Sequence, residues 1–320
     1  MKSSRFGDQM LSSNDIVWRS NRDLRFLQDG RCTAPFPAEF PFLMQFYNAH
    51  ANFHTPPNFH DYLEIFLVYQ GHGVFRFGDK AYDFARGDVF VIGSNEVHNC
   101  VRSDDANTKT IEIYFMPELV YHPGATREDF CHLLPFYNHD DQFNHRVPSG
   151  EIDFEGITRQ LALIYQELLT RGTFFRLAAR NYFKGILLNL ARYYDHLNHT
   201  VYDRVDIPSK QKRLCAVVDY VRDHYHENLT SGCVAKWACM SPEHFCRFFK
   251  KATGSTFTSF LTAFRMARAK ALLEQESMSA TEIAYEVGFN NYSYFHRVFK
   301  NHTEMSPTVY RSTRFRTGMG

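Results

Sequence analysis

The stretch FCRFFKKAT at residues 245–253 returns as FHRVFKNHT at residues 295–303, an offset of 50, and both copies read F-x-R-x-F-K-x-x-T. Each copy follows a short amphipathic stretch and a turn. VAKWACM (234–240) comes before the first copy, and ATEIAYEV (280–287) comes before the second. A helix, a tight turn and a second helix, repeated at a fixed offset, predict two helix-turn-helix motifs in tandem.

Local signals set the ends of these helices. Ser241 is a favourable N-cap with Pro242 at the first helical position, and Ser279 with Glu282 forms the S-x-x-E capping box of the second motif. Between the motifs, an apolar stripe predicts one long connecting helix that fixes the spacing of the two copies. Its expected buried residues are Phe257, Phe260, Leu261, Phe264, Ala267, Ala271 and Leu272.

The second helix of each motif carries side chains suited to reading DNA. Its Phe residues recur at i, i+4 and are expected to face the core, which leaves polar side chains facing outward. Arg247 and Arg297 are predicted to make bidentate contacts to guanine, and Lys250 and Lys300 to hold phosphates. The predicted DNA-binding residues are Glu243, Cys246, Arg247, Lys250, Tyr292, Ser293, His296, Arg297 and Lys300.

The distribution of charge indicates a nucleic-acid partner for one part of the chain only. The whole chain has a formal net charge of +1. From Ser209 to the C-terminus, seven Lys and nine Arg stand against two Asp and seven Glu, a balance of +7, so the first 208 residues carry −6. The basic part is expected to bind double-stranded DNA. The variety of its outward side chains argues against a nucleoid-type architectural protein with little sequence preference.

From about Leu214 to Arg311 the chain resembles the DNA-binding module of the arabinose-regulator (AraC-type) transcription factors. In that family two recognition helices enter successive major-groove segments on one face of the DNA. The resemblance implies a cytoplasmic homodimer that binds promoter DNA, contacts RNA polymerase and responds to a small-molecule effector. The matching residues are Ile283-Ala284, Gly288-Phe289, Ser293-Tyr294-Phe295, Phe299-Lys300, Ser306-Pro307 and Tyr310-Arg311.

The composition is that of a globular protein of two or three domains. The chain has 320 residues, of which 44% are hydrophobic and 22% charged, and this excludes disorder along most of its length. No stretch reaches the roughly 20 apolar residues of a membrane span, and the N-terminus lacks the apolar segment of a secretory signal. Seven scattered cysteines without a C-x-x-C pair fit free thiols in a reducing cytoplasm.

The first part of the chain is expected to be β-rich. Between Leu63 and Phe115, short β-branched and aromatic runs alternate with turn signals, a spacing typical of a sandwich or small barrel. The proline-containing stretch before Leu63 is expected to be extended or looped. From about Phe154 the apolar period becomes 3.6, which predicts a hairpin of two helices that either pads the barrel or forms a dimer interface.

Residues 60–71 read H-x3-E-x6-G and residues 87–98 read G-x5-G-x4-H, a pattern that resembles the two cupin motifs. Enzymatic cupins bind a divalent metal through such residues, although Asn58 stands here at the first His position. The resemblance to regulators implies instead a metal-free effector pocket without a cofactor, for a sugar or related metabolite, with an apolar floor at Phe66, Phe75 and Phe77. Its expected effector-binding residues are Asn58, His60, Glu64 and His98.

The predicted fold class is therefore α+β multidomain, with an N-terminal cupin-like β-barrel, a helical hairpin and a C-terminal all-α tandem helix-turn-helix. We expect the barrel and its N-terminal arm at 1–150, a dimerising hairpin at 151–198, a linker at 199–210 and the DNA-binding domain at 211–320. The predicted function is effector-controlled transcriptional regulation, not catalysis. The alternative is a metal-dependent cupin isomerase or dioxygenase fused to a DNA-binding module.

Overall fold

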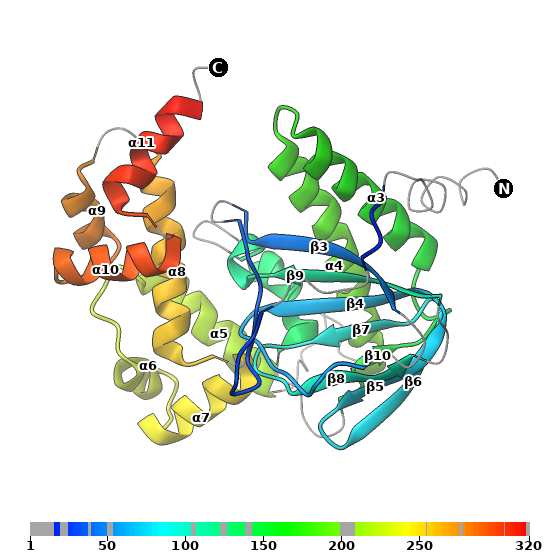
Figure 1. Cartoon of the computed structure of the whole chain (residues 1–320). Coiled ribbons are helices and arrows are strands. Elements are labelled where there is room, and N and C mark those ends of the chain that lie inside the picture. Colours follow the sequence, from blue (N-terminus) through cyan, green and yellow to red (C-terminus); the bar gives the residue numbers. More distant parts are fainter. Residues whose placement is uncertain are drawn as a thin grey trace. The chain divides into compact units, whose positions relative to one another are not determined.

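The computed structural model divides the chain into an N-terminal unit, Met1–Val120 with Glu128–Pro208, and a C-terminal unit, Tyr121–Arg127 with Ser209–Gly320 (Figure 1). Within the described residues, no helix combines the length and apolar character that a membrane crossing requires. The expected linker residues 199–208 lie outside the described part. The described residues are 16–19, 25–37, 40–49, 54–103, 107–121, 127–137, 143–198, 209–253, 255–274, 278–303 and 305–317.

Antiparallel strands form two facing sheets in the N-terminal unit. The strands are β1 (Arg25–Phe26), β2 (Cys32–Thr33), β3 (Phe42–Ala49), β4 (Leu63–Gln70), β5 (His72–Phe77), β6 (Lys80–Ala85), β7 (Val89–Ile92), β8 (His98–Ser103), β9 (Thr108–Phe115) and β10 (Arg146–Val147). The larger sheet has the order β10-β7-β4-β9-β3, and the smaller has the order β6-β5-β8 (Figure 1). β1 and β2 form a separate pair.

The core of this unit lies between the two sheets and is mostly aromatic. Phe66 on β4 contacts Phe75 on β5 with ring centroids 4.7 Å apart, and Phe75 in turn stacks on Phe90 of β7 at 5.0 Å. Side chains at alternate strand positions reach this core, as the period of two residues in a strand requires. The buried cluster comprises Phe66, Val68, Phe75, Phe77, Phe84, Phe90, Ile92 and Cys100.

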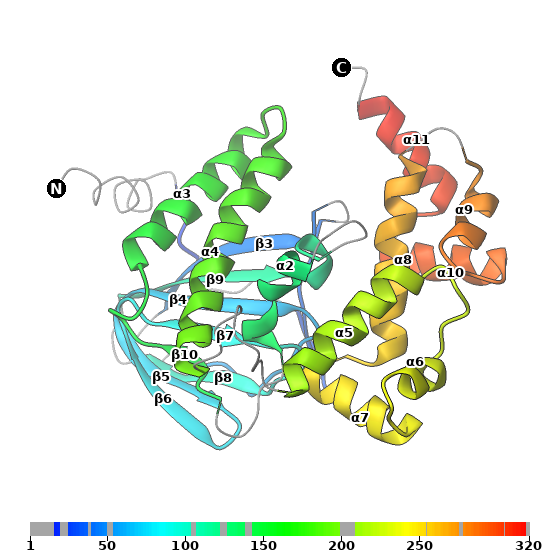
Figure 2. The ribbon, with the colours of Figure 1, turned by 180° about the vertical axis from the view of Figure 1, so that it is seen from behind.

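Two helices cover the outer face of the larger sheet (Figure 2). Phe183 contacts Phe42 on β3 at 5.0 Å and Phe115 on β9 at 4.8 Å, and Tyr165 contacts Phe46 at 5.1 Å. Because both faces of β4 and β9 are covered, almost all residues of these two strands are buried. The helical segments of the unit are η1 (Pro117–Leu119), η2 (Leu134–Phe136), α2 (Arg127–Cys131, partly assigned to the C-terminal unit), α3 (Phe154–Thr170) and α4 (Phe175–Asn198).

Sequence reasoning missed the edge strand β3. It pairs with β9 in unbroken register, from Phe42 opposite Phe115 to Ala49 opposite Thr108. The prolines around it indicated only extended or looped backbone, but Pro41 lies just before the first strand residue, where its missing N–H costs no ladder hydrogen bond. The predicted fold class itself, a β-rich N-terminal part and a helical C-terminal part, is confirmed.

Helices make up the described part of the C-terminal unit. They are α5 (Ser209–His224), α6 (Ser231–Trp237), α7 (Pro242–Thr253), α8 (Phe257–Leu273), α9 (Ala280–Glu286), α10 (Tyr292–Thr303) and α11 (Pro307–Thr317). α6 and α7 form the first helix-turn-helix motif, α9 and α10 form the second, and α8 connects them. Ser279 and Glu282 make the expected capping box, and Ser241 Oγ accepts the N–H of His244 at 3.2 Å.

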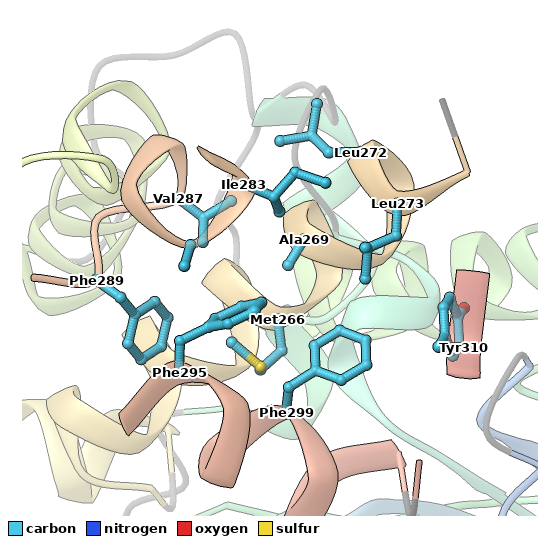
Figure 3. Close-up of a cluster of buried hydrophobic side chains, with 11 residues drawn as sticks. Met266, Ala269, Leu272, Leu273, Ile283, Val287, Phe289, Phe295, Phe299 and Tyr310 are labelled. Atoms are coloured by element: carbon cyan, nitrogen blue, oxygen red, sulfur yellow. The ribbon is translucent and has the colours of Figure 1, made fainter. Parts of the chain in front are cut away.

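The connecting helix α8 packs into one core at each end. Its first residue, Phe257, contacts Phe245 and Phe249 of α7 at 5.4 and 5.5 Å. Its C-terminal half enters the core of the second motif (Figure 3). The predicted stripe was wrong at Ala271, which is exposed, because the helix buries two faces rather than one. The second core comprises Met266, Ala269, Leu272, Leu273, Ile283, Ala284, Val287, Phe289, Phe295, Phe299 and Tyr310.

The Thr that ends each sequence repeat closes its helix. Thr253 and Thr303 are both buried, and each hydroxyl lies 2.8 Å from the carbonyl oxygen four residues earlier, on Phe249 and Phe299. The same two hydroxyls accept the N–H groups of residues 255 and 305 at 3.3 Å. These bonds satisfy backbone groups that a helix end leaves unpaired.

The two motif turns use the same helix-ending geometry with different residues. In each, one residue has a positive φ, 55° at Cys239 and 88° at Gly288. The N–H groups of the following residues, Met240 and Phe289, donate back to carbonyls of α6 and α9 at 2.9 Å. This is the Schellman arrangement, which favours glycine at the positive-φ position. The first motif therefore contains a strained cysteine where the second has glycine.

We predict that Cys239→Gly raises the free energy of unfolding by about 0.5–1 kcal/mol, because glycine relieves the strain but is more flexible when unfolded. Gly288→Ala is the opposite test. Its Cβ would lie 2.8 Å from the Tyr225 carbonyl and 2.9 Å from that of His226, so a loss of about 2 kcal/mol or more is expected. Urea unfolding, followed by Trp237 fluorescence in a Trp18→Phe background, measures both. Equal effects of the two changes would contradict the strain argument.

Candidate functional site

A pocket lies between the sheets of the N-terminal unit, with an empty volume of about 300 Å³ that includes space open to solvent. All four predicted effector-binding residues line it, and so do Phe66 and Phe75 of the expected apolar floor. Phe77 does not, because its ring stacks on His145 at 3.8 Å. The lining residues are Phe26, Thr55, Asn58, His60, Tyr62, Glu64, Phe66, Phe75, His98, Cys100, Glu112 and Tyr114.

Backbone hydrogen bonds bring these residues together from separate segments. Asn58 and His98 exchange backbone bonds of 3.0 and 2.9 Å, and the Asn58 amide nitrogen donates to the His98 carbonyl at 3.1 Å. The N–H of Asn95 donates to the His60 carbonyl at 2.6 Å. Asn95 has φ 61°, a conformation that asparagine tolerates better than most residues. These hydrogen bonds from Asn58 therefore fix the position of the backbone that carries His98.

His60, Glu64 and His98 form a buried triad at the cavity wall. One carboxylate oxygen, Glu64 Oε2, lies 2.9 Å from His60 Nε2 and 3.5 Å from His98 Nε2. The other ring nitrogens face backbone carbonyls: His60 Nδ1 lies 2.9 Å from the Tyr62 oxygen, and His98 Nδ1 lies 2.9 Å from the Glu96 oxygen. Their side chains are at most 5% exposed.

The triad shifts the pKa values of its members in different directions. Burial alone would raise the pKa of Glu64, but hydrogen bonds and charge from His60 and His98 lower it to about 2. Burial lowers the pKa of His60, against the opposing effect of Glu64. Burial also acts to lower the pKa of His98, yet the hydrogen bond and charge of Glu64 outweigh it and raise that pKa. The carboxylate therefore stays ionised, and His98 is the more basic imidazole.

Sequence reasoning missed a second buried carboxylate, Glu112 on β9. It is 1% exposed and accepts hydrogen bonds from the hydroxyls of Tyr114 and, at 3.3 Å, Thr110. Glu64 pairs opposite Tyr114, and Phe66 pairs opposite Glu112, so β4 and β9 together form one cavity wall. The signal was present in residues 110–115, TIEIYF, where polar and apolar side chains alternate as they do in a strand with one polar face.

The charge of the lining determines what the cavity can bind. Among the described residues it contains two carboxylates and two imidazoles but neither Lys nor Arg. Carboxylates accept hydrogen bonds and attract cations. A phosphate or carboxylate group on a ligand would instead meet like charge in a desolvated site. Aromatic rings of Phe66, Phe75 and Tyr62 supply apolar surface next to these polar groups. The site suits a hydroxyl-rich neutral molecule or a cation.

The predicted DNA-binding residues lie on α7 and α10. Phe245, Phe249, Phe295 and Phe299 are fully buried, so the expected inward and outward faces of both helices are present. On α10, the side chains of Tyr292 and His296 are half-buried, and Tyr292 packs against the second core. The exposed members of the set are Glu243, Cys246, Arg247, Lys250, Ser293, Arg297 and Lys300.

A neighbouring aromatic residue positions Arg297. Its guanidinium lies over the ring of Tyr294, 5.4 Å from the centroid, and the Tyr294 N–H donates to Asn291 Oδ1 at 2.9 Å. The Tyr294 ring in turn contacts Phe289 at 5.8 Å. A cation–π contact of this kind is worth about 0.5–1 kcal/mol at an exposed site. This contact therefore orients the Arg297 side chain, in the middle of α10, before any partner binds.

Two family comparisons match the two parts of the chain. Residues 44–141 match the AraC-like ligand binding domain, and residues 234–313 match the helix-turn-helix domain. The first match includes all four predicted effector-binding residues, Asn58, His60, Glu64 and His98. The second includes all nine of the predicted DNA-binding residues on α7 and α10.

Relatives match along most of the chain. The "Arabinose operon regulatory protein" of Escherichia coli is 24% identical over 77% of this chain and 79% of its own length. YdeC, an uncharacterized HTH-type transcriptional regulator of Bacillus subtilis, is 23% identical over 82% of this chain and 88% of its own. Among solved structures, the DNA-binding domain of AdpA, in complex with a target DNA, is 32% identical over 34% of this chain and 98% of its own, with a TM-score of 0.32.

These relatives are transcriptional regulators, and the alternative of a cupin enzyme fused to a DNA-binding module finds no support among them. The two family matches fall in the expected order, ligand-binding domain first and helix-turn-helix domain second. The chain belongs to the AraC family of DNA-binding transcriptional regulators, with an N-terminal ligand-binding domain and double-stranded DNA as its partner.

Proposed function

We propose that this regulator binds a neutral, polyhydroxylated effector, a sugar or a related metabolite, in the cavity of its N-terminal unit. The observation that carries this proposal is the cavity lining, in which Glu64 and Glu112 lie among imidazole, hydroxyl and aromatic groups, with no Lys or Arg in the part of the lining that the structure describes. Carboxylates and imidazoles hydrogen-bond sugar hydroxyls, and aromatic rings pack on the apolar faces of sugar rings. The name of the arabinose operon relative agrees with this class of ligand.

Sequence-specific contacts are assigned to α7 and α10. Arg247 and Arg297 read base edges, with Glu243, Cys246, Ser293, Tyr292 and His296 completing the readout. Lys250 and Lys300, in the last turns of their helices, hold phosphates. The equal placement of an Arg and a Lys in both repeats supports this division of roles. The effector then controls how the two motifs engage a promoter and how RNA polymerase uses it.

The helical hairpin at 151–198 is the proposed homodimer interface. Leu177 and Leu188, eleven residues apart on α4, lie on one face and are 54% and 40% exposed. Phe174 in the turn before α4 is 76% exposed and has φ 63°, an unfavourable conformation for an aromatic residue. Apolar side chains kept exposed along one helix face are typical of an interface. The linker at 199–210 then connects this dimer to the DNA-binding domain at 211–320.

The effector class is tested by thermal shift on the full chain. We expect at least one neutral pentose or hexose to stabilise the protein, by about 2.7 kcal/mol at one hundred times its dissociation constant. Phosphorylated sugars and sugar acids are expected to give no shift. Glu112→Gln should weaken the active sugar at least about tenfold, because a charge-assisted hydrogen bond is lost. The exposed Asp79→Asn change is the matched control. Stabilisation by sugar phosphates or acids alone would refute the proposal.

Base reading and phosphate binding are separated by two substitutions. Arg297→Ala should cost about 1–3 kcal/mol at one base-pair position and leave the others unchanged. Lys300→Ala should weaken all sequences equally and reduce the slope of log affinity against log salt by about 1. The full chain is measured against a selected operator and its single-base variants at several salt concentrations. A uniform loss with Arg297→Ala would make that residue a phosphate contact instead.

The dimer is tested by analytical ultracentrifugation. The double change Leu177→Lys with Leu188→Lys should convert a dimer into a monomer, because four added charges would face each other in the closed interface. Val97→Lys, which alters a half-exposed apolar side chain away from the hairpin, is the control and should remain dimeric. Circular dichroism checks that the variants fold. A wild-type monomer, or a double variant that stays dimeric, would exclude this interface.

A further inference from the structure

Arg265 stands at the middle of α8 and is bound to the loop that leads into the first helix-turn-helix motif. Its Nε donates to the carbonyl oxygen of Tyr225 at 2.9 Å, and its Nη2 donates to that of Glu227 at 2.7 Å. Both carbonyls lie between the end of α5 at His224 and the start of α6 at Ser231. The planar guanidinium can bind two acceptors at once in a fixed geometry, so it holds this loop against α8.

The same guanidinium faces the turn of the second motif. It lies over the ring of Phe289, 5.6 Å from the centroid. A Cβ on Gly288, the preceding residue, would stand 2.9 Å from Nη2 of Arg265. The same Cβ would lie 2.8 Å from the carbonyl oxygen of Tyr225 and 2.9 Å from that of His226. The loop before α6, the middle of α8 and the turn after α9 therefore meet around one side chain.

Apolar packing defines the angle between the motifs less sharply than these polar contacts do. α8 packs Phe257 against α7 at its first turn and enters the second core with its C-terminal half. Hydrophobic burial is non-directional, whereas hydrogen bonds have preferred directions. α8 has 17 residues and is about 26 Å long, so a rotation of one motif by about 10° displaces its far end by about 4 Å. That displacement exceeds one base-pair step of about 3.4 Å.

We propose that Arg265 is the positioning residue that sets the distance between the two DNA segments that the motifs read. It acts through the loop before α6 and the turn after α9, and the inference rests on the proposed assignment of α7 and α10 as the reading helices.

The surroundings of Arg265 fit this role. Burial lowers the pKa of its guanidinium, and in the described part of the chain no carboxylate pairs with it. The carbonyls of Tyr225 and Glu227 and the ring of Phe289 are therefore the groups that compensate its charge. Removing the guanidinium breaks the link between the two motifs without breaking an ion pair.

The test is the dependence of DNA affinity on the spacing of the two segments. The wild-type full chain is footprinted on a selected operator to locate both segments, and their spacing is then changed by one or two base pairs in each direction. We expect the wild type to lose at least about tenfold in affinity for each change, because one segment can no longer be read. Arg265→Lys should lose less than about threefold across the series, since its ammonium lacks the planar fork. On DNA with a single segment the two proteins should bind equally, which a general loss of structure would not give.

Arg268→Lys is the matched control. Arg268 is also a half-buried arginine of α8, about one turn further along, but its buried Nε has no hydrogen-bond partner among the residues that the structure describes. The same substitution there should leave the wild-type spacing profile unchanged. Circular dichroism checks the fold, and Arg265→Gln is the second variant if Arg265→Lys does not fold.

Three results would overturn the proposal. Equal affinity of the wild type at every spacing would do so without any variant. A spacing profile of the Arg265 variants as steep as that of the wild type, or one flattened equally by Arg268→Lys, would do so while leaving the reading assignment intact. Protection of a single segment by the wild type would instead overturn that assignment and this inference with it.

Discussion

The pairing of β4 with β9 is the constraint on which the sensing half of the molecule depends. It sets Glu64 opposite Tyr114 and Phe66 opposite Glu112, and so places two carboxylates inside an otherwise aromatic core. Burying an unpaired carboxylate costs several kcal/mol, and the surroundings offset this cost only where partners are supplied. Each carboxylate has its partners, two imidazoles for Glu64 and two hydroxyls for Glu112. A slip of one residue in this register would turn one of the two carboxylates outward and disrupt the cavity.

The same two strands connect the cavity to the proposed dimer face. Their inner side chains line the cavity, while on their outer side Phe115 of β9 packs against Phe183 of α4. A ligand that changes the spacing of the two sheets therefore acts on the strand layer that packs directly against the helical hairpin. Such a ligand can shift the regulator between two arrangements only by binding one of them more tightly, so the useful contacts are those that differ between the arrangements.

Sequence reasoning was most successful where local chemistry repeats. The F-x-R-x-F-K-x-x-T repeat predicted both motifs. The structure explains the threonine that ends each copy, because Thr253 and Thr303 are buried and hydrogen-bond the ends of their helices. Sequence reasoning was weaker where tertiary packing determines which side chains are buried. Ala271 was placed in the core because the pattern assumed one buried face, whereas α8 serves two cores. Glu112 was missed because the alternation of residues 110–115 indicates a polar strand face but does not identify the partners that fold beside the glutamate.

In the cavity, the sequence motif identifies the residues, whereas their protonation can be inferred only from the structure. The spacing H-x3-E with a distant His located His60, Glu64 and His98, but spacing does not reveal the protonation of a ring. That follows from the carbonyls of Tyr62 and Glu96, which are backbone groups and leave no signature in the sequence. Because Nδ1 of each ring faces a carbonyl, a hydrogen bond from Nε2 to Glu64 requires the protonated imidazole, and burial and the carboxylate act on the pKa of each ring in opposite directions. The charge that the triad presents to the cavity is therefore set by backbone carbonyls and burial, neither of which the sequence motif reveals.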